Sequence, residues 1–176
     1  MKKLSLYVAV CICSFWFSGL VRAQDVIVTY PPDIDSVKID SFYRQYTIDL
    51  TKCDKPELYF EIYRWYKTCY RYGGNSGNGI DCSHFVNMLY EKIYGKKLNN
   101  SSSAMYPQCT PLAHGIDDAA EGDLLFFRIK RGRISHVAIY LQHGKFAHSA
   151  TQSGVIISDI NEPYYKRHFY KAGRLE

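Results

Sequence analysis

"YRYGGNSGNGIDCSHF", residues 70–85, decides how this 176-residue chain folds, because it sets four glycines within seven positions between two helical patterns. The first helix is expected over residues 56–69, where apolar side chains recur at helical spacing and a proline suits the first turn. Asp54 is placed to cap it. The second helix is expected to begin at Cys82 or one residue earlier and to end before Gly95, a residue type that commonly closes helices. The glycine-rich stretch is therefore predicted to be a tight linker between two helices.

From Gly122 onward the pattern changes to short apolar or alternating runs separated by glycine-containing turns, which is typical of β-strands. The predicted strands are residues 124–129, 135–141, 145–150 and 155–158. A short helix is expected at residues 103–108. Helices followed by strands predict an α+β domain in which N-terminal helices pack on a C-terminal antiparallel β-sheet.

Residues 1–23 have the build of an export signal. Lys2 and Lys3 precede a mostly apolar run, and Val21 and Ala23 supply small residues at the two positions that a signal peptidase reads. The run is shorter than the roughly 20 residues that a membrane-spanning helix needs, so a retained anchor is the less favoured alternative. The cysteines of this segment lack the small-residue tripeptide of a lipoprotein signal. We expect an exported protein of the periplasm or cell envelope, with no stable membrane insertion after signal cleavage.

Residues 24–176 are close to the usual size of one domain, about 150 residues. Pro31 and Pro32 predict an extended N-terminal arm over residues 24–52, which would cover a cleft or bind a regulator. Loss of residues 1–23 removes three basic and no acidic side chains, so the formal charge falls from +5 to +2. That excess is too small to predict a nucleic-acid partner.

Four cysteines remain after the predicted signal: Cys53, Cys69, Cys82 and Cys109. In an oxidising compartment an even set usually forms paired disulfides, which would consume Cys82. Spacing alone does not decide between the pairings. If Cys82 is a nucleophile, the other three form at most one disulfide and leave one thiol over.

Three kinds of site commonly use a glycine-rich stretch of this length. A phosphate-binding P-loop needs Lys-Ser or Lys-Thr after its last glycine and a strand before its first, and both are missing. A zinc site needs paired ligands at short intervals, and Cys82 with His84 is the only close pair. A nucleophile fits better, because the N–H groups and dipole at a helix start lower the pKa of a thiol. The plain alternative is a cysteine that packs as a small apolar residue.

A nucleophilic thiol needs a base, and residues 135–150, "SHVAIYLQHGKFAHSA", form a predicted hairpin with a histidine on each arm. A two-residue turn would place His136 and His148 on opposite faces. A three-residue loop with Gly144 in the left-handed conformation sets His148 opposite Ala138, on the same face as His136. We expect the three-residue loop, so that one ring takes the thiol proton and the other orients it. The alternative for each histidine alone is an ordinary strand residue.

Five short motifs occur along the chain in the order "YRYGG", "DCSH", "GDLLFF", "SHVAIY" and "FAHSA". In these motifs and in their order, the chain closely resembles the NlpC family of papain-like cell-wall cysteine peptidases. The resemblance extends from about Lys55 to the end, and residues 153–176 are similar to the murein endopeptidase branch. It implies a papain-like fold with the catalytic domain over residues 53–176.

The resemblance also implies a role for each matching residue. Cys82 would be the nucleophile, His136 the general base and His148 the third, orienting member of a triad. The Tyr70 hydroxyl and a backbone N–H of Cys82 or Ser83 would stabilise the oxyanion. No metal or cofactor is required.

The implied substrate is peptidoglycan, cleaved at an amide bond of a stem peptide or crosslink through an acyl-enzyme. The D-alanyl to diaminopimelate crosslink is favoured over the γ-D-glutamyl to diaminopimelate bond. A non-catalytic wall-binding module and an acyltransferase remain open alternatives. His84 and Ala138 stand where the family has glycine, and His84 leaves the substrate preference in doubt.

Overall fold

The computed structural model describes residues 27–130 and 132–176, so the predicted signal segment lies outside the described residues. The α-helices are α1 (Ser36–Arg44), α2 (Pro56–Trp65), α3 (Cys82–Leu89), α4 (Ser102–Met105) and α5 (Pro163–His168). Short helical turns are η1 (Leu50–Lys52), η2 (Tyr90–Tyr94), η3 (Tyr106–Gln108) and η4 (Gly115–Asp118). The strands are β1 (Asn75–Ser76), β2 (Gly79–Ile80), β3 (Thr110–Pro111), β4 (Leu124–Phe127), β5 (His136–Tyr140), β6 (Lys145–Ala150), β7 (Gly154–Asp159) and β8 (Phe169–Arg174). Within the described ranges, no helix has the length and apolar character to cross a bilayer.

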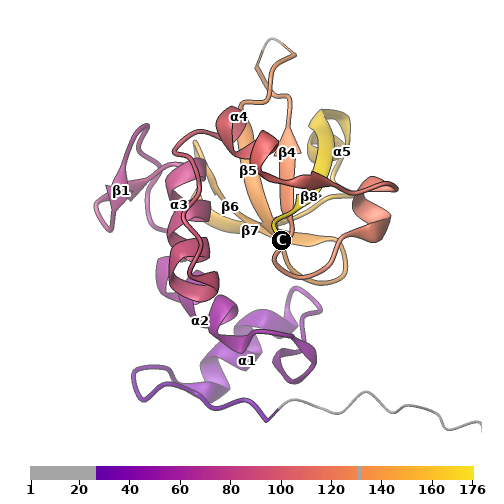
Figure 1. The fold of residues 1–176 in the computed structure, drawn as a ribbon. Helices are drawn as coiled ribbons and strands as arrows, with labels where there is room; N and C mark the ends of the chain where they lie inside the picture. Colours follow the sequence, from indigo (N-terminus) through magenta and orange to yellow (C-terminus); the bar gives the residue numbers. More distant parts are fainter. Residues whose placement is uncertain (1–26, 131) are drawn as a thin grey trace, which may run out of the picture.

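The main sheet has six antiparallel strands in the order β3-β8-β4-β5-β6-β7, with the α-helices of the N-terminal half beside it (Figure 1). The predicted α+β class, helices first and sheet second, is therefore confirmed. Side chains of β4 alternate between the two faces, so that Phe126 joins the core shared with the helices and Phe127 joins a second, smaller core. Tyr165 of α5 packs on that smaller core, so α3 and α5 lie on opposite faces of the sheet.

Helix α3 begins at Cys82 because Asp81 caps it: the carboxylate of Asp81 accepts a hydrogen bond from the N–H of His84 at 2.9 Å. Its apolar stripe, which includes Phe85 and Leu89, is fully buried against the sheet. The chain continues through the π-helical turn η2 and leaves it at Gly95, where φ is 65°. The predicted start is confirmed, whereas the α-helix itself ends at Leu89 and only the π-helical turn continues to the residue before Gly95.

Helix α2 begins at Pro56, as predicted, but its surroundings at that end and its last residue differ from the prediction. Asp54 does not cap it; instead the carboxylate of Glu121 accepts hydrogen bonds from the N–H groups of Asp54 at 3.2 Å and Lys55 at 2.8 Å. Glu121 also accepts the hydroxyl of Tyr59 at 2.8 Å. The helix ends at Trp65 rather than at residue 69, because the backbone groups of the residues that follow form hydrogen bonds with β7 instead of continuing the helix.

That tertiary contact joins the exit of α2 to the start of β7 through backbone atoms only. The N–H of Lys67 donates to the carbonyl of Val155 at 2.8 Å, and the N–H of Val155 donates to the carbonyl of Thr68 at 2.9 Å. Lys67 has a φ of 66°, which no helix continues. Gly154 has a φ of 69°, and a Cβ atom there would lie 2.1 Å from the carbonyl oxygen of Thr68. Only glycine fits this approach.

The β5–β6 hairpin has the register expected from a three-residue loop. Ile139 pairs with Ala147 and Tyr140 pairs with Phe146, and Gly144 has a φ of 75°. The register sets the face on which every side chain of β6 lies, so the loop length fixes where the two histidines point.

Residues 27–52 are not an extended arm, and the prediction is wrong for this part of the chain. Helix α1 is capped by Asp35, which accepts the N–H groups of Val37 and Lys38, and it buries Ile39 and Tyr43. The Tyr43 hydroxyl donates to the carbonyl of Tyr59 in α2 at 2.7 Å. The segment therefore belongs to the core of the helical half (Figure 1).

The last elements, α5 and β8, were not among the predicted ones. Helix α5 begins at Pro163, which suits the first turn of a helix. Strand β8 then runs between β3 and β4, where Ala172 pairs with Leu125. The tail thus adds a central strand to the sheet.

Candidate active site

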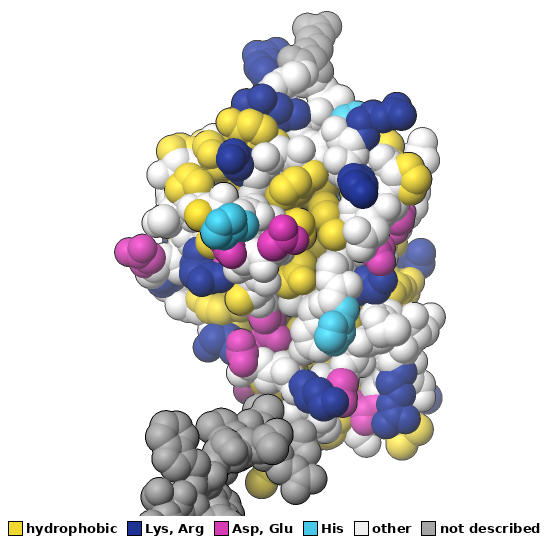
Figure 2. Space-filling model, turned by 90° about the vertical axis from the view of Figure 1, so that its right-hand side faces the viewer, with side chains coloured by type: hydrophobic (Ala, Val, Ile, Leu, Met, Phe, Trp, Pro, Cys, Tyr) yellow, Lys and Arg dark blue, Asp and Glu magenta, His cyan; other side chains and the backbone are white. Residues whose placement is uncertain are grey.

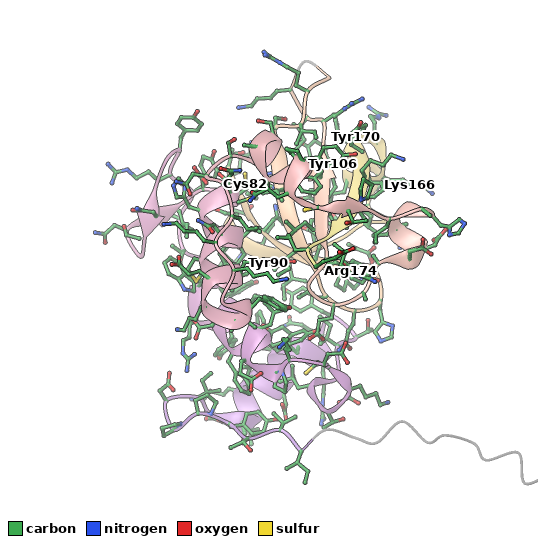
Figure 3. The ribbon with its side chains drawn as sticks, in the orientation of Figure 1. Cys82, Tyr90, Tyr106, Lys166, Tyr170 and Arg174 are labelled. Carbon is green, nitrogen blue, oxygen red and sulfur yellow. The ribbon has the colours of Figure 1, made fainter. Side chains whose placement is uncertain are left out.

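Cys82 occupies the first turn of α3, at the end of the helix that is farthest from α1 (Figure 3). One carboxylate organises its surroundings. Asp81 accepts the N–H of Gly73 at 2.9 Å from the glycine-rich linker, the hydroxyl of Ser83 at 2.8 Å and the N–H of His84. The His84 ring nitrogen Nδ1 lies 3.1 Å from the same carboxylate. Cys82 is 8% exposed and lines a pocket of about 440 Å³.

Burial raises the pKa of the Cys82 thiol to about 11. The nearby backbone N–H groups of Val137 and Ser83 lower this pKa, whereas the negative charge of Asp81 raises it. The N–H groups at the helix start therefore act in the predicted direction, but removal of the sulfur from water has the larger effect. The prediction of a lowered pKa is wrong, and the resting group is a thiol rather than a thiolate.

His136 from β5 and His148 from β6 lie on the same face of the sheet, as the hairpin register predicts. Nε2 of His136 is 2.9 Å from Nδ1 of His148, and the two rings are nearly perpendicular, at 85°. The other ring nitrogen of His148, Nε2, is 3.1 Å from the Ser158 hydroxyl and 3.2 Å from the Tyr165 hydroxyl. His136 is 8% exposed and His148 is 1% exposed.

Both histidines are held in the neutral form. Burial lowers the pKa of His136 to about 4, although the negative charge of Asp81 raises it in part. Burial, and then the charge of His136, hold the pKa of His148 well below its ordinary value. A neutral imidazole is a competent proton acceptor. Cys82 and His136 line the same pocket without a hydrogen bond between them among the described residues, which is common in enzymes without substrate.

Tyr70 and Ser83 contribute to the site in different ways. Tyr70 lines the same pocket as Cys82, and burial followed by the charges of Cys82 and Asp81 raises the pKa of its phenol, so it is a hydrogen-bond donor at neutral pH. The Ser83 hydroxyl lies 2.8 Å from Asp81 and 3.0 Å from the carbonyl of Asn100, so it is used within the fold. Of the polar groups of Ser83, the backbone N–H is therefore the one available as a hydrogen-bond donor beside the Cys82 sulfur.

The structure also places in the pocket residues that the motifs did not indicate. Glu162, Tyr164 and Tyr165 come from α5 and the residue before it, and residues 151–153 come from the β6–β7 turn. Tyr164 is 51% exposed. The side of the molecule shown in Figure 2 carries acidic and basic side chains interspersed over most of its area, with apolar side chains between them. The proline before the two tyrosines was the available signal for this helix.

Three alternatives from the sequence concern disulfides among the cysteines, a metal site, and an N-terminal segment that covers the pocket. All four cysteines of the described chain, Cys53, Cys69, Cys82 and Cys109, are free thiols. No group of three or more His, Cys, Asp or Glu side chains within residues 27–130 and 132–176 is arranged to hold a metal ion. Residues 27–52, as far as they are described, do not line the pocket around Cys82.

Comparison with known proteins places the chain in a family. The model of the NlpC/P60 family matches residues 67–174. Murein DD-endopeptidase MepS/Murein LD-carboxypeptidase of Escherichia coli K12 is 38% identical over 112 residues, which are 63% of this chain and 57% of that protein. A probable endopeptidase of Haemophilus influenzae is 34% identical over 116 residues, which are 64% of this chain and 70% of that protein.

Solved structures agree with the sequence comparison. The crystal structure of an NlpC/P60 family protein from Bacillus cereus superposes with a TM-score of 0.62 at 26% identity, and covers 72% of this chain and 42% of that one. The match to MepS spans little more than half the length of that relative. The chain belongs to the NlpC/P60 family.

Proposed function

We propose that the chain is a cysteine-type peptidoglycan endopeptidase, with Cys82 as nucleophile, His136 as general base and His148 as orienting residue. One observation carries the proposal: a buried thiol at a helix start and two buried, neutral, co-facial histidines line one pocket, and Nε2 of His136 lies 2.9 Å from Nδ1 of His148. The names of the relatives, which are endopeptidases of murein, support peptidoglycan as the substrate. The catalytic domain spans residues 53–176, and residues 1–23 direct export to the periplasm or cell envelope.

The reaction proceeds through an acyl-enzyme. His136 takes the proton of Cys82 as the sulfur attacks the carbonyl carbon of the substrate amide, so no free thiolate accumulates. The Tyr70 hydroxyl and a backbone N–H at the start of α3 donate to the oxyanion. His136 returns the proton to the leaving amine, and a water molecule, activated by the same ring, then releases the acyl group.

The bond cleaved is the D-alanyl to diaminopimelate crosslink. The choice of this bond is supported by the similarity of the chain to a relative named as a murein DD-endopeptidase. The alternative within the same reaction class is the γ-D-glutamyl to diaminopimelate bond. Cys82, His136 and Tyr70 would act identically on either amide, because the acyl-enzyme chemistry is the same.

The test is digestion of purified peptidoglycan with residues 24–176, with Cys82→Ala as the control and mass spectrometry as the readout. New muropeptide ends that require Cys82 are expected, and the masses of the fragments identify the bond. Tyr70→Phe is expected to lower kcat by roughly tenfold to a hundredfold with KM nearly unchanged, since the hydroxyl acts on the transition state. Intact muropeptides from a folded protein with a free Cys82 thiol would overturn the proposal. Transfer products formed with an added amine would instead identify an acyltransferase.

A further inference from the structure

The far end of the histidine pair meets two hydroxyl groups inside the protein. Nε2 of His148 lies 3.1 Å from Oγ of Ser158 in β7 and 3.2 Å from the phenolic oxygen of Tyr165 in α5. Ser158 in turn donates its proton to Tyr165 over 3.3 Å. Ser158 is buried, at 7% exposed, and His148 is almost fully so. The two hydroxyls therefore form the environment of a ring nitrogen that the mechanism above leaves without a role.

The positions of the ring protons connect this end of the chain to the thiol. Nε2 of His136 is engaged with His148, so Nδ1 is the only nitrogen of His136 that can take the proton of Cys82. To act as this base, neutral His136 must hold its one proton on Nε2 and donate it to Nδ1 of His148. His148 must then carry its own proton on Nε2. That proton needs an acceptor, because a buried N–H without a partner is costly.

The Ser158 hydroxyl can supply this acceptor. Its oxygen accepts the Nε2–H of His148 at 3.1 Å through a lone pair, while its own proton goes to Tyr165. The reverse orientation, with a hydroxyl donating to His148, would place the proton of His148 on Nδ1. The proton of His136 would then move to its own Nδ1, and the ring could not take a proton from Cys82.

We infer that Ser158 and Tyr165 are positioning residues that hold His148 as the Nε2–H tautomer and thereby keep Nδ1 of His136 free to act as the base. This inference rests on the proposed function, because the tautomers follow from the role of His136 as the base of Cys82. Ser158 lies 3.1 Å and Tyr165 lies 3.2 Å from Nε2 of His148, so either hydroxyl can accept when the other is missing. Removal of both leaves the Nε2–H of His148 buried without an acceptor.

The test compares residues 24–176 with Ser158→Ala, Tyr165→Phe and the double variant, and reads the histidine tautomers from NMR spectra of ¹⁵N-histidine-labelled protein. In the parent chain both His136 and His148 are expected as Nε2–H tautomers. The double variant is expected to shift His148 toward the Nδ1–H form and to lower kcat by about tenfold or more, with KM within about twofold. Each single variant is expected to keep the parent tautomers and most of the rate.

Tyr140→Phe is the matched control, since it removes a phenol that accepts the N–H of Gly144 at 3.1 Å in the same sheet, away from the histidine pair. It is expected to leave tautomers and rate unchanged. An Nδ1–H tautomer of His148 in the parent chain overturns the inference, whether or not any variant folds. So does a folded double variant with parent tautomers. The tautomer readout needs no turnover, so a parent chain that cleaves no peptidoglycan would count against the proposed function alone.

Discussion

The resting state of Cys82 leads to a measurable rate law for its alkylation. Burial raises the pKa of the thiol to about 11, compared with a reference value of 9.0. At pH 7 the thiolate fraction is then on the order of one in ten thousand, about a hundredfold less than for the reference thiol. The thiolate is the species that reacts with iodoacetamide. Alkylation of Cys82 should therefore accelerate about tenfold for each pH unit between pH 6 and pH 10, without a plateau.

The assay uses the Cys69→Ser variant, because Cys69 is the exposed cysteine of the described chain and competes for the reagent. The extent of modification of the peptide containing Cys82 is followed by mass spectrometry over time at each pH. A thiolate–imidazolium pair would instead give a fast rate that is flat from about pH 5 to pH 9. That flat profile would refute the reasoning, since it would mean that the N–H groups at the helix start and the histidine outweigh burial.

Three further predictions concern stability. The pKa of His136 is lowered to about 4, so below pH 6.5 the unfolded chain binds more protons than the folded one. The free energy of unfolding in urea should therefore fall by up to roughly 3 kcal/mol between pH 6.5 and pH 4, and by less in His136→Gln. An equal fall in both proteins would contradict this prediction. Glu121→Ala should cost about 2 kcal/mol in urea unfolding, because it removes the carboxylate that accepts the N–H groups of Asp54 and Lys55 just before α2. A similar loss for the exposed Glu57→Ala would argue against this role of Glu121. Gly154→Ala should lower the free energy of unfolding by roughly 3 kcal/mol, because of its positive φ and the clash of a Cβ atom with the backbone of Thr68. The control is Gly77→Ala, where a Cβ atom meets no neighbour. Equal melting temperatures of the two variants would show that the backbone moves to accommodate the Cβ atom.

The parts of the fold that follow from short-range rules were predictable. The start of α3 depends on Asp81 and the residues next to it, and the β5–β6 register depends on the three-residue loop that ends at Gly144. These two local features place Cys82 and both histidines. The positions of these three side chains relative to their own elements could therefore be predicted from the sequence, because loop length fixes hairpin register.

The parts that depend on distant segments could not be predicted in this way. The carboxylate that binds the backbone just before α2 belongs to Glu121, more than sixty residues away, and no local pattern indicates it. Helix α1 was hidden by the two prolines before it, although Asp35 is a good helix cap. Tyr165 reaches His148 only because α5 folds back onto the sheet. The predicted direction of the Cys82 pKa shift was wrong for the same reason, since burial, which raises this pKa, is a property of the whole fold.

The backbone contact between α2 and β7 has a consequence for protein engineering. It joins the segment that leads to Tyr70 to the strand that carries Ser158, and it uses main-chain atoms rather than side chains. The side chains of Lys67 and Thr68 take no part in this contact and can be varied, while Gly154 must be kept. At Lys67 the φ of 66° limits the choice to residues that tolerate the left-handed conformation, such as Asn, Asp and Gly. Libraries built at these two positions offer a way to change the surface next to the pocket while its frame stays in place.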